Sequence, residues 1–140
     1  MFAAILNSIL KNAMAMELND LTYKIRGAIF TVHNELGPGL LESVYEVALT
    51  YEPMEMGFDV KTQVSVPVIY KGIQLELGYR MDILVENRVI IEIKSVEALH
   101  DVHKKQLPSY LKLAYRKLGV LVNFNVAKLI DKESLIRIIN

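Results

Sequence analysis

The stretch that decides the fold is Gly78–Ser95, GYRMDILVENRVIIEIKS. Apolar side chains alternate with polar ones on both sides of a polar triplet, Glu86-Asn87-Arg88. This pattern is typical of two antiparallel strands joined by a three-residue turn, with Asn87 the natural residue for a left-handed conformation. Because a slip of one residue would turn an apolar face toward a polar one, the pattern also predicts the register. The expected facing pairs are Val85–Val89, Leu84–Ile90, Ile83–Ile91, Asp82–Glu92 and Arg80–Lys94.

Two acidic residues, Asp82 and Glu92, are the anomaly in this hairpin. Carboxylates that face each other across a strand pair repel, and burial raises the cost until one of them binds a proton or a cation. Burial is expected, because residues 89–93 are almost continuously apolar, as in a strand covered on both faces. Mg²⁺ would relieve the repulsion, since it prefers carboxylate, water and phosphate oxygens. Lys94 projects from the same face as Glu92 and can orient water or hold a phosphate.

These three side chains therefore suit metal-assisted hydrolysis of a phosphodiester, in which a divalent cation activates water and neutralises developing charge. The alternative is a solvated strand face, because Glu-x-Lys is common on amphipathic strands and short motifs match by chance. Both interpretations remain open from these residues alone.

The rest of the chain predicts an α/β fold with a mixed sheet. Helical spacing of apolar residues covers about 21–36 and 40–51, with Gly37-Pro38-Gly39 between these helices and Pro53 ending or kinking the second. Alternation predicts strands over 58–70, 73–85 and 89–95, with a turn at Lys71-Gly72. A helix over 99–118, a strand over 119–124 and an apolar run of undecided type over 136–139 follow. Helices, a three-strand meander, then a helix and a returning strand make a layered sandwich.

Length and composition narrow the class of protein. With 140 residues, one domain is expected, over residues 18–140, with 1–17 as an N-terminal extension. Sixteen basic and sixteen acidic residues leave no global basic field. The absence of cysteine excludes disulfides, thiolate zinc sites and cysteine nucleophiles, and fits a cytoplasmic protein. No apolar run is long enough to span a bilayer. Lys11 follows the first apolar stretch instead of preceding it, so we expect an extra helical turn or a translated leader there, not a signal peptide.

Residues 39–45, GLLESVY, contain Gly39, Glu42 and Tyr45 in the G-x-x-E-x-x-Y spacing, and the chain resembles the GxxExxY protein family over about residues 20–140. That family is similar to small members of the PD-(D/E)XK nuclease superfamily, which implies a restriction-endonuclease-like fold, a mixed β-sheet flanked by helices. The matching segments are Val32-His33, Gly37-Pro38-Gly39, Gly78-Tyr79-Arg80, Asp82, Glu92-Ile93-Lys94-Ser95, His103, Gln106 and Arg137–Asn140.

The resemblance implies roles for individual residues. Asp82 and Glu92 match the metal-binding acids of the superfamily and Lys94 its catalytic lysine. The backbone carbonyl of Ile93 and the carboxylate of Glu42 would be further ligands of a Mg²⁺ or Mn²⁺ ion. Met81 departs from the superfamily pattern, in which a proline nominally precedes the aspartate.

A second element, Gln106-x-x-x-Tyr110, resembles the Q-x-x-x-Y motif of the exonuclease-like branch of the superfamily. Residues four apart on a helix share a face, so both side chains could reach the site. An ordinary half-buried tyrosine with a polar neighbour is the alternative, and Pro108 between them could re-aim Gln106. For His33, a structural histidine is expected.

A nucleic-acid partner, DNA or RNA, would need a local basic surface. Between residues 100 and 119, five lysines and arginines stand against one acid, and Tyr110 and Tyr115 add aromatic rings. A solvated helix face is the alternative interpretation of these charges. The candidate contacts are Lys104, Lys105, Tyr110 and His103, although His103 could instead serve only in packing. Two other functions stay open: a catalytically silent nucleic-acid-binding or regulatory module, and an oligomerising module suggested by the mean hydropathy of +0.27 and the apolar N-terminus.

Overall fold

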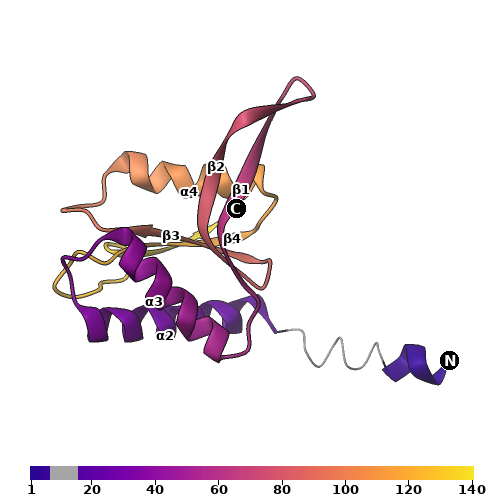
Figure 1. Ribbon diagram of the computed structural model, residues 1–140, viewed down its shortest axis with the longest axis horizontal. Coiled ribbons are helices and arrows are strands. Elements are labelled where there is room, and N and C mark those ends of the chain that lie inside the picture. The colour runs from indigo at the N-terminus through magenta and orange to yellow at the C-terminus, as the bar shows by residue number, and fades with distance from the viewer. Residues whose placement is uncertain (7–15) are drawn as a thin grey trace.

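The computed structural model describes residues 1–6 and 16–140, and its core is a five-stranded mixed sheet in the order β1-β2-β3-β4-β5. Two helices cover one face of the sheet and a third covers the other (Figure 1). Positions 7–15 of the predicted N-terminal extension lie outside the described residues. The elements are α2 (Leu18–Leu36), α3 (Glu42–Glu55), β1 (Val60–Tyr70), β2 (Ile73–Val85), β3 (Val89–Lys94), α4 (Asp101–Leu113), β4 (Leu118–Asn123) and β5 (Leu135–Ile139).

The topology confirms the predicted mixed sheet. β1, β2 and β3 form an antiparallel meander, and β4 lies parallel to β3 after the crossover through α4. β5 pairs antiparallel with β4, so the undecided apolar run near the C-terminus is an edge strand. No helix among the described residues is both long and apolar enough to cross a membrane.

Two hydrophobic cores separate the layers, and the alternation of strand side chains decides which residues enter each. Ile83, Ile91 and Ile93 point toward α2 and α3. Leu84 and Ile90, with the opposite parity, pack against α4. β3 and β4 are buried on both faces, which explains why their sequences are almost uninterrupted apolar runs.

Two helix boundaries differ from the prediction. α4 ends at Leu113, five residues early, because the chain turns at Tyr115, which has a φ of 55°. α3 runs on to Glu55 with Pro53 buried inside its last turns, so the proline does not end the helix there.

β1 and β2 form a long hairpin whose far end extends past α4 (Figure 1). Its turn, Lys71-Gly72, has positive φ at both residues, as expected of a tight hairpin turn. The ladder shifts register between Val66 and Val68. Gly78 lies opposite this irregularity, where a Cβ atom would come within 2.7 Å of the Val66 carbonyl oxygen, so the two strands approach too closely for any larger residue.

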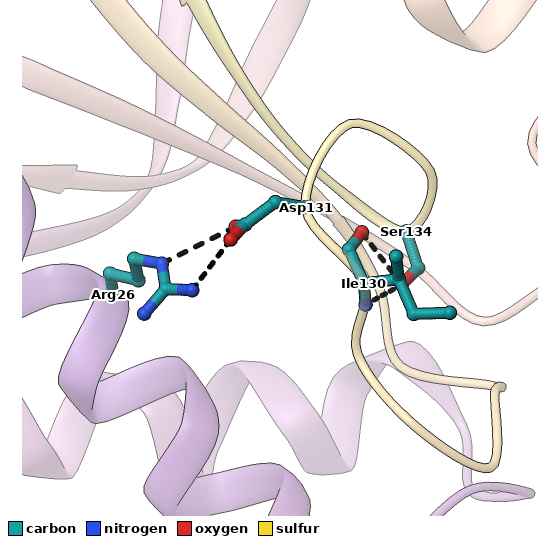
Figure 2. A network of polar contacts seen from close by, with 4 residues as sticks. All are labelled: Arg26, Ile130, Asp131 and Ser134. Atoms are coloured by element: carbon teal, nitrogen blue, oxygen red, sulfur yellow. Dashed lines mark hydrogen bonds and ion pairs between the residues drawn. The ribbon is translucent and has the colours of Figure 1, made fainter.

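The connection between β4 and β5 is tied to α2 by an ion pair. Figure 2 shows Arg26 of α2 pointing to Asp131, with Nη2 2.7 Å and Nε 3.3 Å from the two carboxylate oxygens. Next to it, the Ser134 hydroxyl accepts the Ile130 N–H at 2.8 Å, which closes the turn before β5. The ion pair between Arg26 and Asp131 holds this loop against α2, which lies in the same layer as α3.

Candidate active site

The site begins where β2 and β3 separate. Their ladder has the predicted pairs Val85–Val89, Leu84–Ile90 and Ile83–Ile91, and then stops. Beyond it, the Asp82 N–H donates to Glu92 Oε1 at 3.3 Å, and the Ile93 N–H donates to Asp82 Oδ2 at 2.8 Å. Two acidic side chains thus take hydrogen bonds that a ladder would give to carbonyls. The predicted ladder pairs Asp82–Glu92 and Arg80–Lys94 are wrong, because the ladder between β2 and β3 ends at Ile83–Ile91.

The two carboxyl groups are crowded and withdrawn from water. Glu92 is 4% exposed and Asp82 is half-buried. Burial raises the pKa of Glu92 to about 8, with the nearby Asp82 charge adding to the rise. Burial also raises the pKa of Asp82, and the charges of Glu46 and Glu42 add to that rise against the lowering effect of the Ile93 N–H. The site therefore holds more negative charge than it can neutralise itself.

α3 brings two further carboxylates to the same place. Glu42 is its first residue, and Glu46 follows one turn later on the same face. Both line a cavity of about 180 Å³ together with Asp82, Ile93 and Gln63. Glu42 Oε1 accepts the Ser95 N–H at 3.2 Å, so this carboxylate lies against the end of β3. Glu42 and Ile93 are thus placed beside Asp82, as the resemblance implied.

Tyr45, the last residue of the G-x-x-E-x-x-Y motif, explains why α3 begins where it does. Its hydroxyl donates to the Gly37 carbonyl at 2.6 Å and accepts the Leu40 N–H at 3.2 Å. Its ring is buried and stacks on Phe124 with centroids 4.4 Å apart. Gly37 has a φ of 67°, which favours glycine. The tyrosine thus clamps the break between α2 and α3, and Glu42 follows at a fixed position.

α4 contributes two side chains, Gln106 and Tyr110, that form a series of hydrogen bonds with Lys94. Lys94 Nζ donates to Gln106 Oε1 at 3.2 Å, and Gln106 Nε2 donates to the Tyr110 hydroxyl at 2.7 Å. Burial, with the nearby Glu92 charge, raises the pKa of Tyr110 to about 12, so its hydroxyl stays protonated. The structure brings these three residues together although Pro108 lies inside the helix.

The remaining predicted residues lie elsewhere on α4 or α2. His103 Nδ1 accepts the His100 N–H at 3.0 Å, which makes it part of the helix start. Lys104 and Lys105 are exposed on α4. His33 is buried, with Nε2 2.8 Å from the Val126 carbonyl oxygen, as expected of a structural histidine.

Two residues at the site were not predicted. Glu46 could have been found from its position four residues after Glu42 on one helix. Gln63 lies in β1 between the residues that pair with Ile83 and Met81, so it sits across from Asp82, and its Nε2 donates to Glu46 Oε1 at 2.6 Å. Its place depends on the register between β1 and β2, which no local motif in the sequence marks.

The donor set fits a hard divalent cation, because carboxylate oxygens are the preferred ligands of Mg²⁺ and Mn²⁺. Burial and neighbouring acids disfavour the charged forms of Asp82 and Glu92, and a bound cation would stabilise those charged forms. Within residues 1–6 and 16–140, no group of three or more acidic or histidine side chains is arranged to hold a metal ion unaided. An ion here would need water or substrate oxygens, as is usual for Mg²⁺.

Comparison with known protein families matches residues 19–138 to the PD-(D/E)XK nuclease superfamily. Neither the curated proteins nor the solved structures contain a match to this chain. The family match spans the sheet and the three helices that pack on it, except for the first residue of α2 and the last residue of β5. The observed mixed sheet flanked by helices is the restriction-endonuclease-like arrangement that the sequence predicted. The chain belongs to the PD-(D/E)XK nuclease superfamily.

Proposed function

We propose that the protein is a nuclease that hydrolyses phosphodiester bonds of DNA or RNA with the help of Mg²⁺ or Mn²⁺. The observation that supports this most is the pair of carboxyl groups at the fork between β2 and β3, where burial, with the nearby Asp82 charge, raises the pKa of Glu92 to about 8. Lys94 lies near both acids and lowers their pKa values, but its charge does not offset burial and the further acids, Glu42 and Glu46, that approach Asp82.

In this proposal Asp82 and Glu92 hold the cation, with Glu42 and the carbonyl of Ile93 as further donors. When bound, the ion would lower the pKa of a coordinated water and neutralise charge on the phosphate. Lys94 uses one of its three N–H donors on Gln106, which leaves two for the attacking water or a phosphate oxygen. Gln106 and Tyr110 hold the lysine in place, because it would otherwise rotate freely at the end of β3.

A cleavage assay tests the proposal. Labelled single-stranded and duplex DNA and RNA are incubated with the wild type, Asp82→Asn and Glu92→Gln in Mn²⁺, Mg²⁺ or EDTA. We expect cleavage by the wild type in Mn²⁺ or Mg²⁺ only, and a loss of at least about 100-fold in both variants, because charge stabilisation at a reacting phosphate is a large part of the rate. Glu133→Gln, an exposed acid before β5, is the matched control and should retain full activity.

Calorimetric titration of Mn²⁺ locates the ion without any substrate. One binding event in the wild type and in Glu133→Gln, absent in Asp82→Asn, is expected. Equal and background cleavage by the wild type and Asp82→Asn in every metal would refute catalysis. If nucleic acid were still bound, that result would favour the catalytically silent binding module.

A further inference from the structure

A groove runs between the β1–β2 hairpin and the C-terminal end of α4, apart from the carboxylates. It has a volume of about 400 Å³, within the range of ligand sites. Its floor is apolar and its rim carries three cations, Lys61, Lys112 and Arg116, with no acidic side chain among the residues that line it. Lys112 and Arg116 lie at a helix C-terminus, where the dipole favours cations. The helix dipole does not explain Lys61, which lies in β1. The three cations on one rim thus form a surface that suits an anion.

Tyr115 lies at the edge of this groove in an unfavourable backbone conformation. The Arg116 N–H donates to the Leu111 carbonyl at 2.9 Å and the Tyr115 N–H to the Lys112 carbonyl at 3.4 Å, the pattern that ends many helices in a left-handed residue. Glycine or asparagine usually occupies that position, because a Cβ atom is costly there. A tyrosine with a φ of 55° and 90% exposure gains nothing from packing. Its ring is a free aromatic face beside three cations.

Arg116 is held ready for a ligand. Its Nη1 donates to the Ala114 carbonyl and its Nη2 to Asn87 Oδ1, both at 2.7 Å. Asn87 belongs to the turn between β2 and β3, so the guanidinium bridges two elements. A cation that is fixed before binding loses less conformational entropy when it meets a phosphate.

The elements that form the groove also carry residues of the proposed active site. Met81, which lines it, precedes Asp82 on β2, and Lys112 follows Tyr110 by two residues on α4. The groove and the proposed active site thus share β2 and α4, although none of the described residues lines both cavities.

We propose that this groove binds a single-stranded segment of nucleic acid, with a base stacked on Tyr115 and phosphates beside Lys61, Lys112 and Arg116. The inference rests on the proposed function for its substrate class. Duplexes bury their base faces, whereas an unpaired strand offers both faces to an aromatic ring and an apolar floor. A cationic rim with an exposed aromatic side chain is the combination by which proteins bind single strands.

Fluorescence anisotropy with a labelled 20-nucleotide oligo(dT), its RNA counterpart and a duplex of the same length tests the assignment. EDTA is present, so binding is measured without cleavage. Tyr115→Asn suits the left-handed position and removes the ring, Tyr115→Phe keeps it, and Lys61→Gln/Lys112→Gln removes two rim charges. The matched control, Lys24→Gln/Lys128→Gln, removes two exposed lysines from α2 and the loop after β4.

We expect Tyr115→Asn to weaken binding of single strands about 5- to 100-fold without lowering the melting temperature, and Tyr115→Phe to bind like the wild type. The rim double variant should reduce the slope of log K against log salt by about 1.4, whereas the control double variant should not change it. Unchanged affinity in both Tyr115→Asn and the rim variant would overturn the inference, as would preferred binding of the duplex.

The Mn²⁺ cleavage assay separates this inference from the proposed function. Cleavage by Tyr115→Asn with an unaltered KM would support the nuclease function and refute the role of the groove in binding. Single-strand binding that depends on Tyr115, with no cleavage in any metal, would do the reverse.

Discussion

Replacing Glu92 by glutamine should remove the main pH dependence of stability between pH 5 and 8. The wild-type carboxyl group has a pKa near 4.5 in the unfolded chain and about 8 in the folded protein, because it is buried beside Asp82. Between these values the folded state binds a proton that the unfolded state has lost. The free energy of unfolding of the wild type therefore falls as pH rises from about 4.5 to about 8, and levels off above that.

The size of the effect follows from the shift. A difference from 4.5 to about 8 corresponds to on the order of 5 kcal/mol, with a slope of at most about 1.4 kcal/mol per pH unit. This is a large part of the 5–15 kcal/mol that typically stabilises a domain. Glu92→Gln has the same shape and no titration, so it should match the wild type near pH 5 and exceed it by several kcal/mol at pH 8 and above.

Urea unfolding of both proteins in EDTA at half-unit steps from pH 5 to 9 measures this difference. The two chains are otherwise identical, so the difference between their curves reports on the carboxyl group of Glu92 and on its interaction with Asp82. Mn²⁺ at pH 8 should narrow the gap, because an ion that binds the carboxylate favours the ionised folded state. Parallel stability curves for the two proteins across the whole range would refute the burial argument.

Four further substitutions test other parts of the structure. Gly78→Ala should lower the free energy of unfolding by about 1–3 kcal/mol, because the new Cβ atom would meet the Val66 carbonyl oxygen at 2.7 Å. Gly27→Ala in α2 should raise the free energy of unfolding by about 0.5–1 kcal/mol, because a Cβ atom there meets no neighbouring atom within 4 Å. Urea midpoints that move the same way in both would contradict this. Gln106→Ala removes the hydrogen bonds to Lys94 and Tyr110, and steady-state cleavage should show a kcat about 100-fold lower with little change in KM; an unaltered kcat would exclude the positioning role. Arg26→Met breaks the ion pair with Asp131, whose side chains are 46% and 60% exposed, so thermal unfolding should show a loss below about 1 kcal/mol that shrinks in high salt; a larger loss would mean that the pair organises the whole loop.

The fold was predictable from sequence where apolar faces had to match. The register of β2 and β3 follows from Ile83 and Ile91 belonging to one core and Leu84 and Ile90 to the other, since any slip would bury polar side chains. The same argument fails beyond Ile83, because apolar matching ends there and β2 stays paired with β1. The separation of the strands is a tertiary effect that no pair of facing residues shows.

The candidate site was predictable to the same extent. Asp82, Glu92 and Lys94 stand out because charged residues are rare in buried strands, and Glu42, Gln106 and Tyr110 were added by the resemblance. Gln63 was not, because its place depends on how β1 pairs with β2. Tyr115 was expected only as an aromatic residue near the basic stretch, because the sequence does not show the left-handed backbone conformation at the end of α4 that makes it unusual.

The exchange of hydrogen bonds at the fork has a consequence for how inactive forms of the protein should be made. Asp82 is the acceptor for the Ile93 amide, and Glu92 for the Asp82 amide. Truncating either acid to alanine would strand a main-chain donor as well as delete a charge, at a cost of about 1–3 kcal/mol for each. An alanine variant would thus lose activity through destabilisation of the sheet as well as through loss of charge. The amide variants Asp82→Asn and Glu92→Gln keep an acceptor oxygen in place and test the loss of charge alone.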